Sequence, residues 1–94
     1  MKLGGNEFTI TTNLTKLSQR VASALATLEN PDIVGARYEG LVYVGKQTVK
    51  GVNYWFIAEQ TLITREPETH IVKIAVNDFK GKMEIAAGSI ERIF

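Results

Sequence analysis

The spacing of apolar residues along this 94-residue chain changes from strand-like to helix-like near Leu14. Residues 8–11 suit a short extended segment, and a stripe at helical spacing follows it, formed by Leu14, Leu17, Val21, Ala24, Leu25 and Leu28. We expect one long helix of about 16 or 17 residues, roughly 25 Å in length. Thr12 or Asn13 would be its N-cap, and it would end at Asn30-Pro31, because proline disfavours helical backbone in the residue before it.

The pattern after residue 33 is typical of β-strands. We expect one strand from about Val34 to Lys46, with a bulge or bend at Gly40 in its interior. The next strand, Val52 to about Thr64, carries apolar side chains on both faces, which favours a central position in a sheet. Apolar and polar residues then alternate over 72–77 and 82–87, as in two further strands.

These elements predict one α+β domain over residues 1–94, with the long N-terminal helix packed across a twisted antiparallel sheet. Alternate turns of such a sheet lie at opposite ends. The hairpin tips Gln47–Gly51 and Asp78–Gly81 should therefore share one end, while the turn at residues 66–68 lies at the other. Residues 90–94 keep three apolar side chains and are expected to dock on the sheet.

Composition and charge exclude several classes of function. The chain has no cysteine, which excludes disulfides and thiolate sites, and its net charge of +1 predicts no strong attraction to nucleic acid. Lys46, Lys50, Lys80 and Lys82 gather at the end with the two tips, where they either orient an encounter or discourage strand pairing. No row of aromatics accompanies them. No apolar run approaches the ~20 residues of a membrane span, and no signal peptide opens the sequence. We expect neither a nucleic-acid nor a membrane partner.

Few residues have the chemistry or the spacing of a catalytic site. His70 is the only histidine, and no serine lies in a nucleophile motif. Glu68 is close to His70 in the sequence, but at no spacing typical of a metal site. We interpret Trp55 as a packing residue and expect no enzyme activity, no metal and no cofactor.

The hairpin at Gln47–Gly51 is the most specific feature of the sequence, since its tip exposes Val49 beside a glycine. The segment matches the Gln-x-Val-x-Gly signature of the cystatin family of cysteine-protease inhibitors, and Asn53-Tyr54 resembles its usual continuation. Leu3-Gly4-Gly5 is similar to the N-terminal trunk of the stefins, the intracellular branch of this family, which also lacks disulfides and a signal peptide.

This resemblance implies a cystatin-like fold and a wedge that blocks papain-like cysteine proteases reversibly and competitively. Its protease-binding residues would be Leu3, Gly4 and Gly5 in the trunk, Gln47, Thr48, Val49, Lys50 and Gly51 in the first tip, and Asp78, Phe79 and Lys80 in the second. Family members usually carry a proline in the second tip, where this chain has Phe79 as its apolar residue. The resemblance also implies a cytoplasmic protein.

Two further expectations accompany this reading. The altered second tip leaves open an alternative, a cystatin-fold binding module that recognises another macromolecule through the same edge and inhibits no protease. The oligomeric state is expected to be a monomer, with a domain-swapped dimer accessible if backbone strain at Val49 opens the first hairpin.

Overall fold

One helix and seven strands make up the described part of the chain, residues 2–3 and 5–94 of a computed structural model, with side chains described from residue 5 onward. The elements are β1 (Lys2–Leu3), β2 (Asn6–Thr11), α1 (Gln19–Leu28), β3 (Ala36–Val49), β4 (Gly51–Leu62), β5 (Glu68–Phe79), β6 (Lys82–Ile85) and β7 (Glu91–Arg92). All strand pairs are antiparallel, in the order β1-β2-β3-β4-β5-β6, and β7 pairs with β5.

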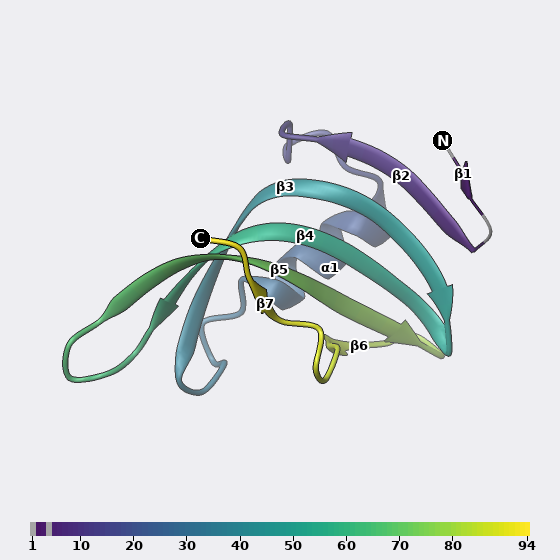
Figure 1. Cartoon of the computed structure of the whole chain (residues 1–94). Coiled ribbons are helices and arrows are strands. Elements are labelled where there is room, and N and C mark those ends of the chain that lie inside the picture. Colours follow the sequence, from purple (N-terminus) through teal and green to yellow (C-terminus); the bar gives the residue numbers. More distant parts are fainter. Residues whose placement is uncertain (1, 4) are drawn as a thin grey trace.

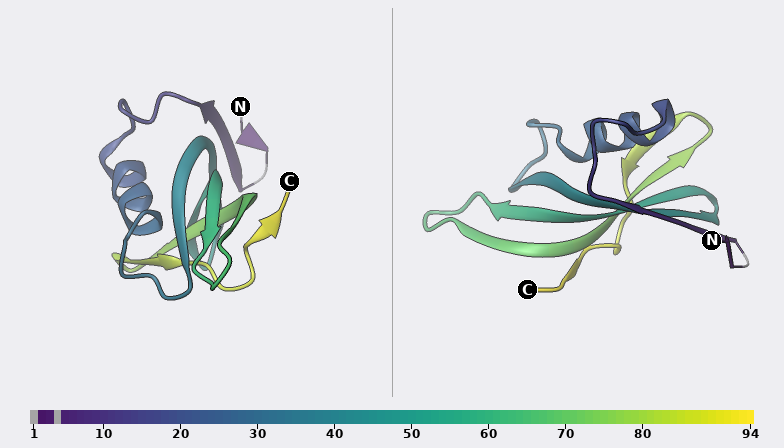
Figure 2. Two further views of the ribbon diagram at one scale, coloured as in Figure 1. Left: turned by 90° about the vertical axis from the view of Figure 1, so that its left-hand side faces the viewer. Right: turned by 90° about the horizontal axis from the view of Figure 1, so that it is seen from above.

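The sheet is strongly bent, and α1 packs against one of its faces (Figure 1). Seen from above, the helix lies on one side of the sheet and the C-terminal segment lies on the other (Figure 2). The prediction of an α+β fold with a helix packed on an antiparallel sheet is confirmed. The position of β4 between β3 and β5 also confirms that it is a central strand.

The prediction of a long helix is wrong, since α1 has only 10 residues. Its N-cap is Ser18, not Thr12 or Asn13, and the Ser18 hydroxyl accepts from the Val21 N–H at 3.5 Å. Asn13 instead caps a local turn, because its side-chain oxygen accepts from both the N–H and the hydroxyl of Thr15. Short polar side chains of this kind compete with helical hydrogen bonds. The helix ends within two residues of the predicted stop.

The segment before α1 contributes to the core although it is not helical. Leu14 and Leu17 pack against the buried cluster from this irregular segment. The apolar spacing therefore predicted correctly that they contact the core, but wrongly that they lie in a helix. The cluster itself lies between α1 and the concave face of the sheet. Its members are Val21, Ala24, Leu28, Tyr43, Tyr54, Phe56, Ala58, Val72, Ile74 and Val76.

Tyr43 places a hydroxyl-bearing ring in this core, with its centroid 5.5 Å from that of Phe56. Burial raises the pKa of Tyr43 to about 12, with smaller contributions from Tyr54 and from the carboxylate of Glu7. An ionised phenol would lose hydration there, so the neutral form is held. Tyr43 is therefore a neutral member of the core over the physiological pH range.

Two irregularities in β3 shape the sheet. The pairing between β3 and β4 shifts register between Gly40 and Val42, which confirms the bulge predicted at Gly40, and shifts again between Tyr43 and Gly45. Bulges of this kind bend a strand and increase its twist. The C-terminal residues also dock as predicted, since the backbone of Phe94 exchanges hydrogen bonds with Ile71 on β5.

Candidate functional site

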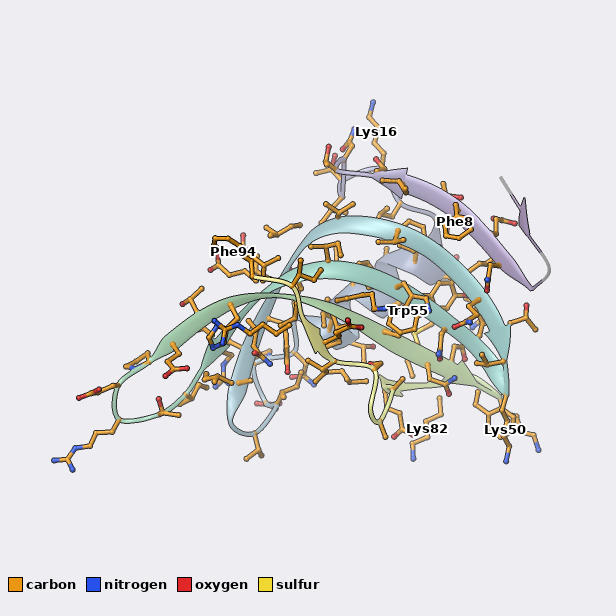
Figure 3. All side chains as sticks on the ribbon, in the orientation of Figure 1. Phe8, Lys16, Lys50, Trp55, Lys82 and Phe94 are labelled. Atoms are coloured by element: carbon orange, nitrogen blue, oxygen red, sulfur yellow. The ribbon has the colours of Figure 1, made fainter. Side chains whose placement is uncertain are left out.

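The first hairpin tip is tighter than the sequence suggested. Gln47, Thr48 and Val49 belong to β3, and β4 resumes at Gly51, so that Lys50 stands alone at the apex. Gly51 has a φ of 83°, a conformation that glycine adopts without a steric penalty. The Val49 side chain is 44% exposed. Figure 3 places Lys50 at the far end of the sheet from the long β4–β5 turn.

The backbone strain expected at Val49 is not present. In the described part of the chain, Lys80 is the one non-glycine residue with a positive φ, at 54°. Gly51 takes the left-handed conformation that this turn requires, and Val49 remains extended as the last residue of β3. The proposed driving force for hairpin opening and domain swapping is therefore absent from this turn.

The two tips lie side by side, as predicted. Val52 pairs with Asp78 in the β4–β5 register, which places the ends of both hairpins at the same end of the sheet. A Cβ atom on Gly51 would lie 2.3 Å from the backbone oxygen of Asp78, so a glycine is required at this crossing. The Asn77 amide nitrogen also donates to the Lys50 carbonyl oxygen at 3.1 Å. Backbone contact and a side-chain hydrogen bond thus hold the tips together.

The second tip presents an aromatic ring close to two ammonium groups. Phe79 is 37% exposed, and the Nζ atoms of Lys50 and Lys80 each lie 5.3 Å from its ring centroid. Attraction between an ammonium and the face of an aromatic ring is favourable at this range. Val49 and Phe79 therefore form a small apolar edge with a positive border.

Asp78 does not share this exposure. Its side chain is 8% exposed and its carboxylate pairs with the guanidinium of Arg20 on α1, at 2.9 Å. Asp78 lies on the same face of β5 as the buried Ile74 and Val76, which explains its inward direction. Asp78 is one of the predicted site residues, but it ties the second tip to α1 through this ion pair and does not belong to the exposed edge.

The N-terminal segment reaches the same end of the molecule. Its backbone doubles back as β1 and β2, with Leu3 opposite Asn6. The Thr48 N–H donates to the carbonyl oxygen of Gly5 at 2.8 Å. Gly4 and the side chain of Leu3 lie outside the described residues. The predicted trunk is thus brought beside the first tip at Gly5, and Figure 1 shows β2 running along the same edge of β3.

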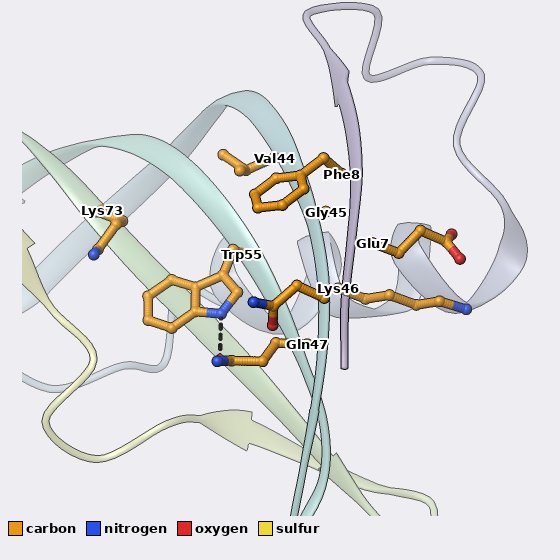
Figure 4. Close-up of a pocket in the computed structure, with 9 residues that line it drawn as sticks. Glu7, Phe8, Val44, Gly45, Lys46, Gln47, Trp55 and Lys73 are labelled. Atoms are coloured by element: carbon orange, nitrogen blue, oxygen red, sulfur yellow. Dashed lines mark hydrogen bonds between the residues drawn. The ribbon is translucent and has the colours of Figure 1, made fainter. Parts of the chain in front are cut away.

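Gln47 points away from the tip, onto the convex face of the sheet. Its side-chain oxygen accepts a hydrogen bond from the indole N–H of Trp55 at 3.1 Å. Phe8 pairs with Gly45, and Gly45 pairs with Trp55, so a glycine separates two aromatic residues in one cross-strand row. A cavity of about 250 Å³ opens at this row. Figure 4 shows Phe8 and Trp55 on its two sides.

The sequence did not identify this convex cavity. Trp55 was assigned to packing and Phe8 to a short extended segment, while Gly45 drew no interpretation. A glycine inside an aliphatic strand is the signal that could have drawn attention to it. Lys73 on β5 also lines the cavity, and its Nζ lies 5.1 Å from the Trp55 ring centroid.

The remaining candidate chemistry is sparse. His70 contacts Glu68 at 3.1 Å, on an exposed strand end. No group of three or more potential metal ligands gathers within residues 2–3 and 5–94. In that same part of the chain, no helix has the length and hydropathy to cross a lipid bilayer. Comparison of the chain with protein-family models, curated proteins and solved structures gives no match.

Proposed function

We propose that this protein is a reversible, competitive inhibitor of papain-like cysteine proteases, of the stefin-like type that its sequence resembles. The observation that supports the proposal is the meeting of three segments at one end of the molecule. Gly5 is hydrogen-bonded to Thr48, and Gly51 touches the backbone of Asp78. Trunk, first tip and second tip are therefore neighbours, as a wedge entering an active-site cleft requires.

The physical properties of this edge suit such a role. Backbone pairing and the Asn77 hydrogen bond fix the two tips before any partner arrives. A preformed edge loses little conformational entropy on binding, which favours affinity. Val49 and Phe79 supply the exposed apolar groups. The tips can fill a cleft without offering an extended peptide for cleavage, because at each tip the chain reverses its direction within one or two residues.

The proposal also assigns a cystatin-like arrangement to the fold. In the family that the sequence resembles, the order is an N-terminal trunk, a long helix, the signature hairpin, a second hairpin and a C-terminal strand. The order β2, α1, β3, β4, β5 and β6 supports it. The short helix and the additional strands β1 and β7 differ from the family pattern named above. A stefin-like assignment further implies a monomeric protein of the cytoplasm.

Titration of papain with the purified chain tests the proposal. We expect competitive inhibition that is lost in Val49→Asp, because a carboxylate at the tip would be desolvated in an apolar subsite. The matched control is Val34→Asp. Val34 is 96% exposed and precedes β3 at the opposite end of the sheet. Wild-type chain that leaves papain active at micromolar concentration, or equal inhibition by both variants, would contradict the proposal.

A second candidate function is a binding module that uses the same edge without inhibiting proteases. The positive border around Phe79 favours it, since Lys50 and Lys80 suit a partner with an acidic surface. In this case papain remains active, and a partner identified from the native source binds the wild-type chain and Val34→Asp but not Val49→Asp. Its association rate should fall steeply with added salt.

A further inference from the structure

We propose that the convex cavity between Phe8 and Trp55 is a binding site for a small planar aromatic carboxylate. This site is separate from the proposed inhibitory edge. It belongs to the face of the sheet that α1 leaves uncovered, at the row formed by Phe8, Gly45 and Trp55. Three features carry the assignment: the spacing of the two aromatic residues, the polar groups that border them, and the size of the cavity.

The spacing suits an inserted ring. Phe8 and Trp55 lie on strands that are separated by β3, so their backbones are about 9.5 Å apart at the usual strand spacing. Aromatic pairs contact with centroids about 4.5–7 Å apart, so a third ring can contact both. Gly45 contributes no side chain to the gap. Its φ is 150°, and a Cβ there would lie 2.1 Å from the backbone oxygen of Glu7, so this gap is built into the fold.

The polar groups at the cavity select for negative charge. The Lys73 ammonium lies 5.1 Å from the Trp55 ring centroid and 3.2 Å from the carboxylate of Glu91. An ammonium has three donors, so it can serve both Glu91 and a ligand carboxylate. The Gln47 oxygen is bound to the Trp55 indole, which leaves its amide N–H groups as donors beside the ring.

Two carboxylates lie near the cavity. Glu91 pairs with Lys73 and offsets part of its charge, which is one reason why the expected contribution of a ligand carboxylate is modest. Glu7 also lines the cavity, but its side chain extends to the far side of β2 from the two rings, as does that of Lys46 (Figure 4). A sugar would need acceptors for its hydroxyl groups, and the Glu7 carboxylate is not directed at the aromatic gap. The cavity volume of about 250 Å³ lies below the range of drug-sized sites, which limits the ligand to one or two rings.

Nuclear magnetic resonance offers a direct test, because Trp55 is the only tryptophan and its indole N–H gives a single assignable signal. We expect benzoate to shift this signal saturably. Benzamide lacks the negative charge and should bind about fivefold more weakly, because it cannot form the partly exposed ion pair with Lys73. Cyclohexanecarboxylate has the charge but no planar ring, and should also bind more weakly. Equal affinities for benzoate and benzamide would overturn the proposal that the site selects a negatively charged ligand.

Variants separate the site from general surface effects. Lys73→Gln should weaken benzoate binding about fivefold, while Lys46→Gln removes the same charge from a side chain directed away and should leave binding unchanged. Phe8→Leu keeps an apolar group on β2 but removes the stacking ring, and should weaken binding by up to about tenfold. Equal effects of Lys73→Gln and Lys46→Gln, or no saturable shift in the wild type, would refute the proposal.

An aromatic carboxylate can be a free acid or the C-terminal residue of a peptide. Acetyl-Gly-Phe and its C-terminal amide distinguish these sources. Tighter binding of the peptide acid than of benzoate identifies a peptide terminus, and the reverse order identifies a free acid. Val49→Asp should bind benzoate like the wild type, so the result does not depend on protease inhibition.

Discussion

Replacing Gly51 with alanine tests the close approach of the two hairpin tips. Gly51 has a φ of 83°, and a Cβ there would meet the backbone oxygen of Asp78 at 2.3 Å. Gly81 offers a matched control in the other tip. Its φ is 81°, almost the same, but a Cβ on Gly81 would have no atom within 4 Å. Gly51→Ala and Gly81→Ala therefore share the conformational penalty and differ in the steric one.

The magnitudes follow from this difference. A left-handed backbone costs a non-glycine residue about 1–2 kcal/mol, which is the destabilisation expected for Gly81→Ala. Gly51→Ala adds a clash with backbone, which relieves itself only if the tips separate. Separation breaks the end of the β4–β5 ladder and the Asn77 hydrogen bond to Lys50, at about 1 kcal/mol for each bond. We expect Gly51→Ala to destabilise by about 3–4 kcal/mol in total.

Urea unfolding at 25 °C measures both variants, with unchanged denaturant slopes as the check on two-state behaviour. Each kcal/mol should also lower the melting temperature by about 4–8 °C in a domain of this size. In the papain titration, Gly51→Ala should inhibit more weakly than Gly81→Ala, because the first tip is displaced from the second. Equal losses of stability in the two variants would show that the tips do not meet as described.

Two other predictions concern the core and its ion pair. The free energy of unfolding should fall by up to about 2 kcal/mol as pH rises from about 10 toward 12, because Tyr43 ionises near pH 10 when unfolded and near 12 when folded. Urea titrations of Tyr43→Phe should lack this contribution of Tyr43 to the pH dependence. Arg20→Gln should destabilise the protein by about 1–3 kcal/mol, because it leaves the Asp78 carboxylate buried without its partner. The double variant with Asp78→Asn should recover part of this loss, and additive losses in the double-mutant cycle would argue against the pair.

Much of the fold could be predicted from short-range pattern. The β-rich runs, the bulge at Gly40 and the placement of two tips at one end all follow from alternation and turn residues, which act over a few positions. The helix was predicted only in part. Leu14 and Leu17 have helical spacing and are packed against the core, but the Asn13 side chain, hydrogen-bonded to Thr15, stabilises a local turn around Leu14, and the helix begins only after Ser18.

The candidate site was predictable to the same limited extent. Val49 and Phe79 were identified from their positions at the tips, and the direction of Asp78 could have been read from the alternation of Val72, Ile74 and Val76 on the same face of β5. Its partner could not, because Arg20 is distant in sequence and reaches Asp78 only when α1 packs on the sheet.

The sequence by itself determined which segments pair as hairpins and which residues turn the chain, because these choices depend on neighbours a few positions apart. Only the tertiary structure decided the convex cavity. The two bulges in β3 change which face each residue occupies, so alternation cannot be extended across them. The cross-strand register then brings Phe8 and Trp55 to either side of Gly45, a relation between strands that no local pattern contains.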